Sequence, residues 1–244
     1  MSIIRAKSHL EEYRARTRLP DIAELSGRSA QTNRQVAAAI VPELKLSRED
    51  VLVDVGCGDG NLLELVANLV ESAIGICPTP EEVQRVKQQH PDVDLREGTA
   101  QDLPLGDKSV SRLVCNSVIL VLESEADVKL ALREFARVTR GLVYVGEVPA
   151  VPIKTDVRSD SPSVWLKGLW RYGGAKYVLA GCRDLLVAAM GKRDLIFCPD
   201  HWLYFEPYHF IQIAESCGLR FISVRTTPHA AERRDYVFYA DVAI

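Results

Sequence analysis

An apolar strand, a glycine-rich turn and a helix follow one another at residues 51–70. Residues 51–55 (VLVDV) have the composition of a buried strand, and residues 61–70 carry apolar side chains at helical spacing. The turn between them places glycines at positions 56, 58 and 60. Such glycines let the backbone approach a ligand that a side chain would block, and the helix that follows presents free N–H groups. The sequence therefore predicts a ligand site at the first turn of a βαβ unit.

Strands and helices alternate regularly up to residue 148. Thr79 is a predicted N-cap followed by Pro80, and Ser124 with Asp127 caps a second helix. After residue 204, a helix and two strands joined by a polar loop predict an antiparallel hairpin. The expected strands are 51–55, 73–77, 93–97, 112–118, 142–146, 219–224 and 235–242, and the expected helices are 35–43, 61–70, 80–90, 125–140 and 207–216. The predicted fold class is α/β, a doubly wound, mostly parallel seven-stranded sheet with an antiparallel edge strand and a helical insertion.

The regular pattern breaks between residues 149 and 203. This stretch contains clustered prolines, Trp165, Trp170 and a pair of glycines around a short amphipathic segment. We interpret it as an insertion with its own helices within one structural domain overall. The predicted segments are an N-terminal helical lid (1–34), a ligand-binding core (35–148), the insertion (149–203) and a C-terminal completion of the sheet (204–244).

The composition of the 244 residues narrows the function classes. With 47% hydrophobic and 26% charged residues and a net charge of −3, the chain reads as a globular protein for which a nucleic acid is not the expected partner. The six cysteines lie at least sixteen residues apart, so we expect reduced thiols, no metal site and a cytoplasmic location. The charged N-terminal residues and the lack of a long apolar run predict no secretory signal and no stable membrane insertion.

The spacing of the glycine turn separates two kinds of nucleotide-binding protein. In the dinucleotide fingerprint G-x-G-x-x-G the third glycine would fall at Asn61, so a nicotinamide cofactor is disfavoured. The segment 51–60, a strand with Asp54 before the glycines, instead resembles the first motif of the class I S-adenosylmethionine-dependent methyltransferases, in their small-molecule, methyltransferase-11-like branch. The likeness extends over residues 35–148 and, more loosely, 204–244. It implies a Rossmann-like fold with S-adenosylmethionine bound by the core.

The resemblance also implies which residues hold the methyl donor. Asp54 would order the turn and approach the donor's amino group. Two positions depart from the family, because Cys77 stands where an acid usually binds the ribose hydroxyls and Thr99 replaces another acid. A thiol is a weak partner for two hydroxyls, so the ribose would be held by backbone groups, water or another side chain. The implied donor-binding residues are Asp54, Gly56, Cys57, Gly58, Cys77, Pro78, Thr99, Ala100, Gln101, Asn116 and Ser117.

Methyl transfer from a sulfonium depends mainly on the alignment of donor and acceptor. A base contributes when the acceptor is a hydroxyl, and it would lie over the carboxyl ends of the strands. The candidates are Glu147, His201, His209 and Tyr204. Each also has a structural interpretation, Glu147 as a helix-capping acid and the histidines as packed side chains among aromatic residues. The sequence leaves the catalytic residue open.

The class of acceptor follows by elimination. The segment 116–119 (NSVI) lacks the Asn-Pro-Pro-Tyr motif of the branches that modify amides and adenine, and no basic stripe points to RNA or DNA. The aromatic and leucine content of residues 149–203 suits a pocket for an apolar or aromatic small molecule. We expect O-methylation of such a molecule. N- or C-methylation, a lipid-linked or sugar acceptor and a noncatalytic binding module are the alternatives, and the oligomeric state stays open. Lys167, Arg171 and Lys176 beside the tryptophans fit a weak membrane-surface contact, an anionic acceptor or ordinary solvated surface.

Overall fold

The structure, a computed structural model, describes residues 3–5, 30–150, 195–197, 203–228 and 230–240, with single positions between 175 and 186. The chain divides into two compact units. One consists of Met1–Pro20 and Ile153–Trp202, and the other of Asp21–Pro152 and Leu203–Ile244. In the first unit, β1 (Ile3–Arg5) pairs in parallel with β7 (Leu195–Phe197). The predicted segment boundaries near residues 34, 148 and 203 stay predictions.

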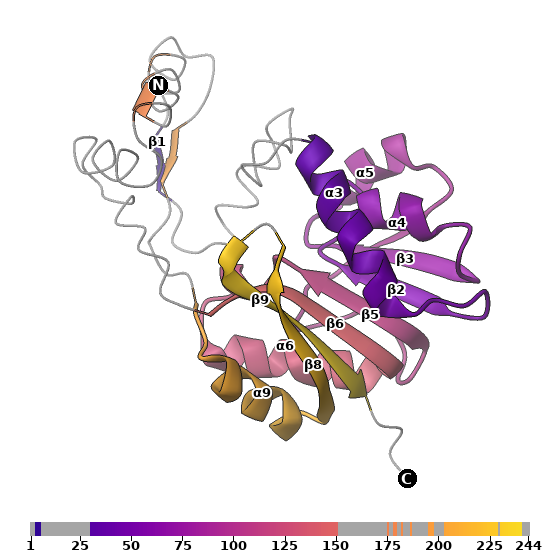
Figure 1. Cartoon of the computed structure of the whole chain (residues 1–244). Coiled ribbons are helices and arrows are strands. Elements are labelled where there is room, and N and C mark those ends of the chain that lie inside the picture. Colours follow the sequence, from indigo (N-terminus) through magenta and orange to yellow (C-terminus); the bar gives the residue numbers. More distant parts are fainter. Residues whose placement is uncertain are drawn as a thin grey trace. The chain divides into compact units, whose positions relative to one another are not determined.

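The second unit contains a seven-stranded sheet in the order β4-β3-β2-β5-β6-β9-β8. Its strands are β2 (Val51–Val55), β3 (Ser72–Cys77), β4 (Asp94–Glu97), β5 (Val110–Asn116), β6 (Thr139–Pro149), β8 (Leu219–Thr227) and β9 (Ala230–Ala240). The strands from β4 to β6 are parallel, and β9 runs antiparallel to both of its neighbours, β6 and β8. The predicted doubly wound, mostly parallel seven-stranded sheet is therefore confirmed, and β9, next to the edge strand β8, is the strand that runs in the opposite direction (Figure 1). The predicted helical insertion and the N-terminal lid lie almost entirely outside the described residues.

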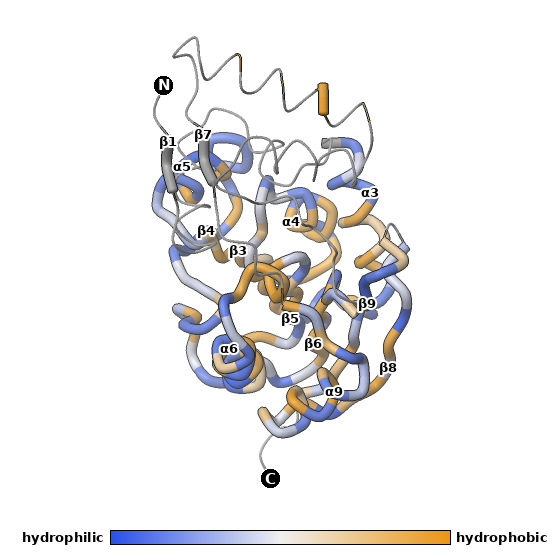
Figure 2. Tube along the Cα trace, turned by 90° about the vertical axis from the view of Figure 1, so that its left-hand side faces the viewer, coloured by the Kyte–Doolittle hydropathy of each residue, from blue (hydrophilic) through white to orange (hydrophobic). Residues whose placement is uncertain are grey.

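Helices cover both faces of this sheet. They are α3 (Ala30–Ile40), α4 (Asn61–Val66), α5 (Pro80–Gln89), α6 (Glu125–Val138) and α9 (Pro207–Ser216), with short 3-10 turns η1 (Val41–Leu44) and η2 (Ile119–Val121). In Figure 1, α3, α4 and α5 lie on one side of the strands and α6 and α9 on the other. Each face has its own hydrophobic core, one packed beneath α3, α4 and α5 and the other beneath α6 and α9. Along the trace in Figure 2, hydrophobic residues are concentrated around β3 and β5, where the two cores meet the sheet.

Local signals set the helix starts. Thr79 Oγ1 accepts a hydrogen bond from Glu82 N (3.2 Å), and Ser124 Oγ accepts one from Asp127 N (3.2 Å), so both predicted caps are present. The ends of other elements differ from the prediction. Helix α4 stops at Val66, four residues before the predicted end, and the apolar residues that extended the pattern, Leu69 and Val70, lie beyond it. Strand β9 begins at Ala230, since pairing with β8 extends it over polar residues that carry no strand pattern.

Candidate active site

The carboxyl ends of the parallel strands meet at one edge of the sheet, where α/β proteins bind ligands. The register aligns Val55 with Ile76 and with Cys115, Cys77 with Glu97, and Asn116 with Gly146. The segments that follow β2, β3, β4 and β5 therefore lie along this edge. Together with the last residues of the strands, Cys77 of β3 and Asn116 of β5, they contain all of the donor-binding residues implied by the sequence from Gly56 to Ser117, and Asp54 lies within β2 beside them.

The glycine turn after β2 is tied to the neighbouring strand. The N–H groups of Gly56 and Cys57 both donate to the carbonyl of Ile76 on β3, at 2.9 and 3.2 Å. Gly56, Gly58 and Gly60 have φ values of +75°, +54° and +73°, and Gly60 is the N-cap of α4. Because side chains rarely tolerate this left-handed backbone, the turn requires glycine. The turn therefore has a fixed shape in front of the helix N-terminus.

The glycines of this turn differ in what surrounds them. A Cβ added to Gly56 would lie 2.5 Å from Cγ2 of Val118, so this glycine allows close packing against the segment after β5. A Cβ added to Gly58 would meet no atom within 4 Å. Gly58 therefore borders open space, which a ligand could fill and a side chain would obstruct.

Asp54 is a buried carboxylate at the base of the turn. It is 5% exposed, and its side chain makes no hydrogen bond within the described part of the chain. Burial alone raises the pKa of Asp54 to about 7. A buried carboxyl without a partner is costly in its charged form, so a positively charged ligand group at this position would stabilise the carboxylate. The amino group of an amino-acid ligand would meet that requirement.

Cys77 does not present its thiol as an open substitute for an acid. Its side chain is fully buried, and its Sγ lies 3.4 Å from Sγ of Cys57. The contact with Cys77, together with burial, raises the pKa of the Cys57 thiol. The carbonyl of Cys77 accepts a hydrogen bond from Gly98 N (2.9 Å), and Thr99 and Asp102 exchange backbone hydrogen bonds of 3.2 Å. This pairing brings the turn of residues 98–102, with Ala100 and Gln101, beside the end of β3.

Ser117 and Glu147 form the other half of the edge, after β5 and near the end of β6. Both are non-glycine residues in the left-handed conformation, with φ of +59°. Ser117 Oγ donates to Oε2 of Glu147 (2.6 Å), and Nη1 of Arg233 donates to the same oxygen (2.6 Å). Glu147 is 1% exposed, so this is a buried ion pair. Strained backbone and a buried ion pair at a strand end are frequent at functional sites.

Asp235 on β9 holds the backbone of Glu147. Its Oδ1 accepts hydrogen bonds from the N–H of Glu147 (3.0 Å) and the hydroxyl of Thr227 (2.6 Å). Its Oδ2 accepts from Nε of Arg225 (3.1 Å), and Arg225 also pairs with Glu43. The β6–β9 register shifts between Val145 and Val148, where Glu147 lies. The carboxylate of Asp235 thus stabilises the irregular backbone that turns Glu147 toward Ser117.

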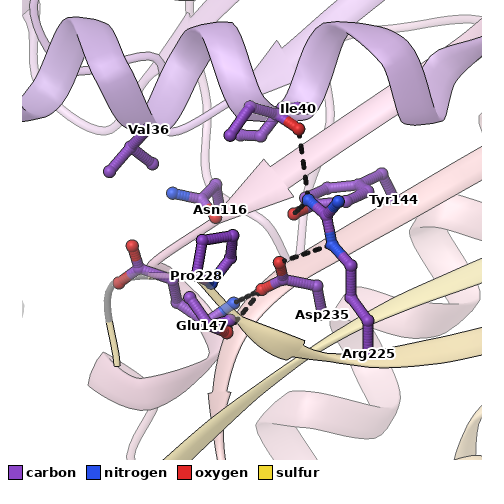
Figure 3. A pocket seen from close by; sticks show the side chains of 10 residues that line it. Val36, Ile40, Asn116, Tyr144, Glu147, Arg225, Pro228 and Asp235 are labelled. Atoms are coloured by element: carbon purple, nitrogen blue, oxygen red, sulfur yellow. Dashed lines mark hydrogen bonds and ion pairs between the residues drawn. The ribbon is translucent and has the colours of Figure 1, made fainter. Parts of the chain in front are cut away.

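Figure 3 shows a small cavity lined by Glu147, Arg225 and Asp235 together with residues of α3 and β5. Its volume is about 10 Å³, enough for one water molecule, and Asn116, Glu147 and Asp235 contribute to its walls. Arg225, Asp235 and Arg233 were missed by the sequence reasoning. The only available signal was the presence of charged residues inside predicted strands, since their partners lie far away in the sequence.

The other candidate bases have different surroundings. His209 is half exposed, and its Nε2 lies 3.0 Å from Oε2 of Glu125 on α6. Its ring stacks on Phe205 with centroids 6.4 Å apart. Tyr204 is 52% exposed, and His201 lies outside the described residues. Of the four candidates, only Glu147 has a hydrogen bond to a residue implied in donor binding within the described part of the chain.

The described residues contain neither a metal cluster nor a membrane-spanning helix. No group of three or more His, Cys, Asp or Glu side chains is arranged to hold a metal ion there. The described helices include none with the length and apolar character needed to cross a membrane.

Known proteins share both the sequence motif and the fold. Residues 53–144 match the sequence profile of a methyltransferase domain. A probable S-adenosylmethionine-dependent methyltransferase of Mycolicibacterium smegmatis is 38% identical over 77 residues, which are 32% of this chain and 30% of that protein. An uncharacterised methyltransferase-like protein of Schizosaccharomyces pombe is 24% identical over 63% of each chain. The chain thus spans less than two thirds of the length of these curated relatives.

Solved structures share the fold at low sequence identity. Phosphoethanolamine N-methyltransferase 1 of Haemonchus contortus, in complex with phosphoethanolamine and S-adenosylhomocysteine, has a TM-score of 0.66 and 12% identity over 97% of this chain and 50% of that chain. The cyclase SpnF has a TM-score of 0.61 and 12% identity over 99% of both chains. These likenesses show the fold alone.

The residues at the sheet edge fit S-adenosylmethionine. Gly58 borders open space beside a helix N-terminus, and Asp54 is a buried carboxylate that lacks a hydrogen-bond partner among the described residues. The methyltransferase profile covers the strands and turns that carry both features. Residues 53–144 thus match a methyltransferase domain, and the arrangement of the same residues fits S-adenosylmethionine as the ligand.

Proposed function

We propose that the protein transfers the methyl group of S-adenosylmethionine to a hydroxyl of a small-molecule acceptor. The observation that carries the proposal is the turn after β2, in which Gly58 borders open space and which follows the buried carboxyl of Asp54 in the chain. The bound donor would supply an electrophilic methyl group on a sulfonium, which an acceptor oxygen displaces in line. The rest of the catalysis depends on how the chain's own residues position the two molecules, which can contribute about 7–11 kcal/mol.

Different residues along this edge would bind different parts of the donor. The carboxylate of Asp54 would pair with the donor's amino group, and the backbone at Gly58 would pass beside its methionine portion. Ala100 and Gln101, which the 98–102 turn brings beside β3, would border the adenine. Asn116, at the end of β5, would lie next to the reacting methyl group. These roles extend the family resemblance to residues that lie along one edge of the sheet.

Glu147 is the proposed contact for the acceptor. Its Oε2 is already bonded to Ser117 and Arg233, so the side chain is fixed in position. A fixed carboxylate at this edge can accept a hydrogen bond from an acceptor hydroxyl and orient its oxygen toward the methyl group, taking the proton as the new bond forms. The Haemonchus contortus neighbour acts on a small molecule according to its name, which supports the same class of acceptor here.

Calorimetry and mass spectrometry test the proposal together. Titration with S-adenosylhomocysteine should give saturable binding at one site. Incubation with metabolite extracts and donor that carries a deuterated methyl group should then yield a labelled product. Absence of heat at millimolar ligand would contradict donor binding, and binding without any labelled product from a broad set of extracts would favour the second candidate.

A noncatalytic binding module is that second candidate. It is favoured by Cys77, whose buried thiol contacts Cys57 in place of an acid that would bind ribose. The cyclase SpnF has the same fold, so the fold by itself does not establish methyl transfer. The labelled-product experiment separates the two candidates.

Replacement of Glu147 by glutamine should reduce methyl transfer by about 10²–10⁴-fold while leaving S-adenosylhomocysteine affinity within about twofold. The amide keeps the shape of the side chain but cannot accept a proton or balance the charge of Arg233. Labelled-product rates and calorimetry measure the two effects. Glu232→Gln is the matched control, because Glu232 is the exposed carboxylate next to Arg233, and its rate should equal that of the wild type. Equal rates for Glu147→Gln and the wild type would remove Glu147 from the reaction.

A further inference from the structure

We propose that Cys57 and Cys77 form a redox-active dithiol that hydrogen peroxide converts to a disulfide, and that this disulfide weakens the donor site. The two sulfurs lie 3.4 Å apart and come from different elements, the glycine turn and the end of β3. The first part of the proposal is independent of the proposed function. The second part relies on donor binding by the turn.

The backbone around the two thiols keeps them facing each other. The carbonyl of Ile76, next to Cys77, accepts hydrogen bonds from both Gly56 and Cys57. The distance between the sulfurs must fall to about 2.05 Å in a disulfide, a change of little more than 1 Å. Cys115 is also fully buried at this edge of the sheet, but its sulfur has no bond to another thiol within the described residues. Proximity therefore distinguishes the pair from a cysteine that only fills the core.

The two thiols differ in access. Cys57 is 8% exposed, whereas Cys77 is completely buried. A small oxidant such as hydrogen peroxide would therefore react first with Cys57, and Cys77 would resolve the product. The contact with Cys77, burial and the nearby carboxyls of Asp54 and Glu82 all raise the pKa of Cys57. The resting thiol of Cys57 is thus protonated, and because the thiolate is the reactive form, oxidation requires sustained exposure to peroxide.

The chemistry balances with peroxide as the only oxidant. The sulfur of Cys57 attacks one peroxide oxygen, the O–O bond breaks, and the products are a sulfenic acid at Cys57 and one water molecule. The sulfur of Cys77 then displaces the hydroxyl from Cys57, which leaves with the thiol proton as a second water molecule. In sum, two thiols are oxidised to one Sγ–Sγ bond and one hydrogen peroxide is reduced to two water molecules.

The disulfide would change the turn that holds the donor. Cys57 lies between Gly56 and Gly58, so movement of its sulfur toward β3 pulls the backbone on both sides. Gly58 borders the open space assigned to the donor, whereas the Cβ position of Gly56 already lies against Val118. Displacement of the donor by about 1 Å would also misalign its methyl group, and such a misplacement can lower a reaction rate by about 10²-fold. We expect S-adenosylhomocysteine to bind at least tenfold more weakly to the oxidised protein.

The test uses the full chain, first reduced and then exposed to hydrogen peroxide. Trypsin leaves both cysteines in one peptide, residues 49–85, whereas cleavage after Glu64 and Glu71 separates them. Mapping with a glutamate-specific protease without reductant should reveal a peptide pair joined through Cys57 and Cys77. Calorimetry should show the loss of affinity and its recovery after dithiothreitol. Absence of this linkage would overturn the proposal, and a complete linkage with unchanged affinity would overturn its second part.

Variants separate this linkage from other oxidation. In Cys57→Ala and Cys77→Ala, the affinity for S-adenosylhomocysteine should be the same before and after peroxide treatment. Each variant is compared with its own untreated form. Cys115→Ser should keep the full peroxide response, because Cys115 makes no thiol contact. A peroxide effect that persists in both alanine variants would assign the loss of affinity to another site and refute the proposal. Failure of the untreated, reduced protein to bind S-adenosylhomocysteine would instead count against donor binding, while the linkage itself is still decided by peptide mapping.

Discussion

Gly58→Val should abolish S-adenosylhomocysteine binding while leaving the protein folded. The added side chain would enter space that contains no protein atom within 4 Å of the Cβ position, so it obstructs the ligand without creating a clash in the fold. The backbone at φ +54° adds strain of about 1–2 kcal/mol for a residue other than glycine. We expect an affinity loss of more than about 100-fold, equivalent to roughly 2.7 kcal/mol, and only a moderate fall in the melting temperature. Calorimetry and thermal unfolding measure the two quantities.

Two other glycines provide the comparison. Gly218 has φ +93° at the end of α9, and a Cβ there would lie 3.6 Å from Cβ of Ala136. Gly218→Val carries a similar backbone cost away from the glycine turn, so its affinity should match that of the wild type. Gly56→Ala should mainly lower stability, because its Cβ would lie 2.5 Å from Val118. Unchanged affinity in Gly58→Val would show that the ligand binds elsewhere.

The sequence predicted the parts of the site that depend on local signals. The glycine turn follows from its spacing, and the N-caps at Thr79 and Ser124 follow from residue types within four positions of each other. The doubly wound sheet follows from the alternation of strands and helices, which leaves few topologies. These features are set by neighbouring residues, so a single sequence reveals them.

Contacts between distant strands were not predictable in the same way. Glu147 meets Arg233 and Asp235 across 86 and 88 residues, and only the antiparallel pairing of β9 with β6 brings them together. Ser117 and Glu147 have a left-handed backbone although neither is a glycine, so no residue type in the sequence indicated this conformation. The contact of Cys57 with Cys77 depends on how the glycine turn packs against the end of β3, whereas the cysteine spacing predicted only reduced thiols. Tertiary pairing, rather than propensity, decides each of these.

The affinity for S-adenosylhomocysteine should fall about tenfold between pH 8 and pH 6. Burial raises the pKa of Asp54 to about 7 in the free protein, so the carboxyl is mostly protonated at pH 6. The positively charged amino group of the ligand favours the carboxylate and lowers this pKa, so binding below pH 7 releases a proton. Affinity therefore rises with pH through 7 and then levels off. Calorimetry in two buffers of different ionisation enthalpy should show release of nearly one proton per ligand at pH 6 and close to none at pH 8.

Asp54→Asn separates the effect of this buried carboxyl on folding stability from its contribution to ligand binding. A folded-state pKa raised above the unfolded value of 3.8 means that the folded protein binds more protons, so this group's contribution to stability is greatest below pH 4 and is lost as pH rises through 7. The neutral amide should therefore stabilise the ligand-free protein at pH 8 by about 1–3 kcal/mol in chemical denaturation. The same substitution should weaken S-adenosylhomocysteine binding and remove its dependence on pH between 6 and 8. A variant that is less stable at pH 8, or whose affinity still falls at pH 6, would show that Asp54 is not the titrating partner of the donor. A gain in stability combined with a loss of binding is the expected result for a carboxyl whose partner is supplied by the ligand.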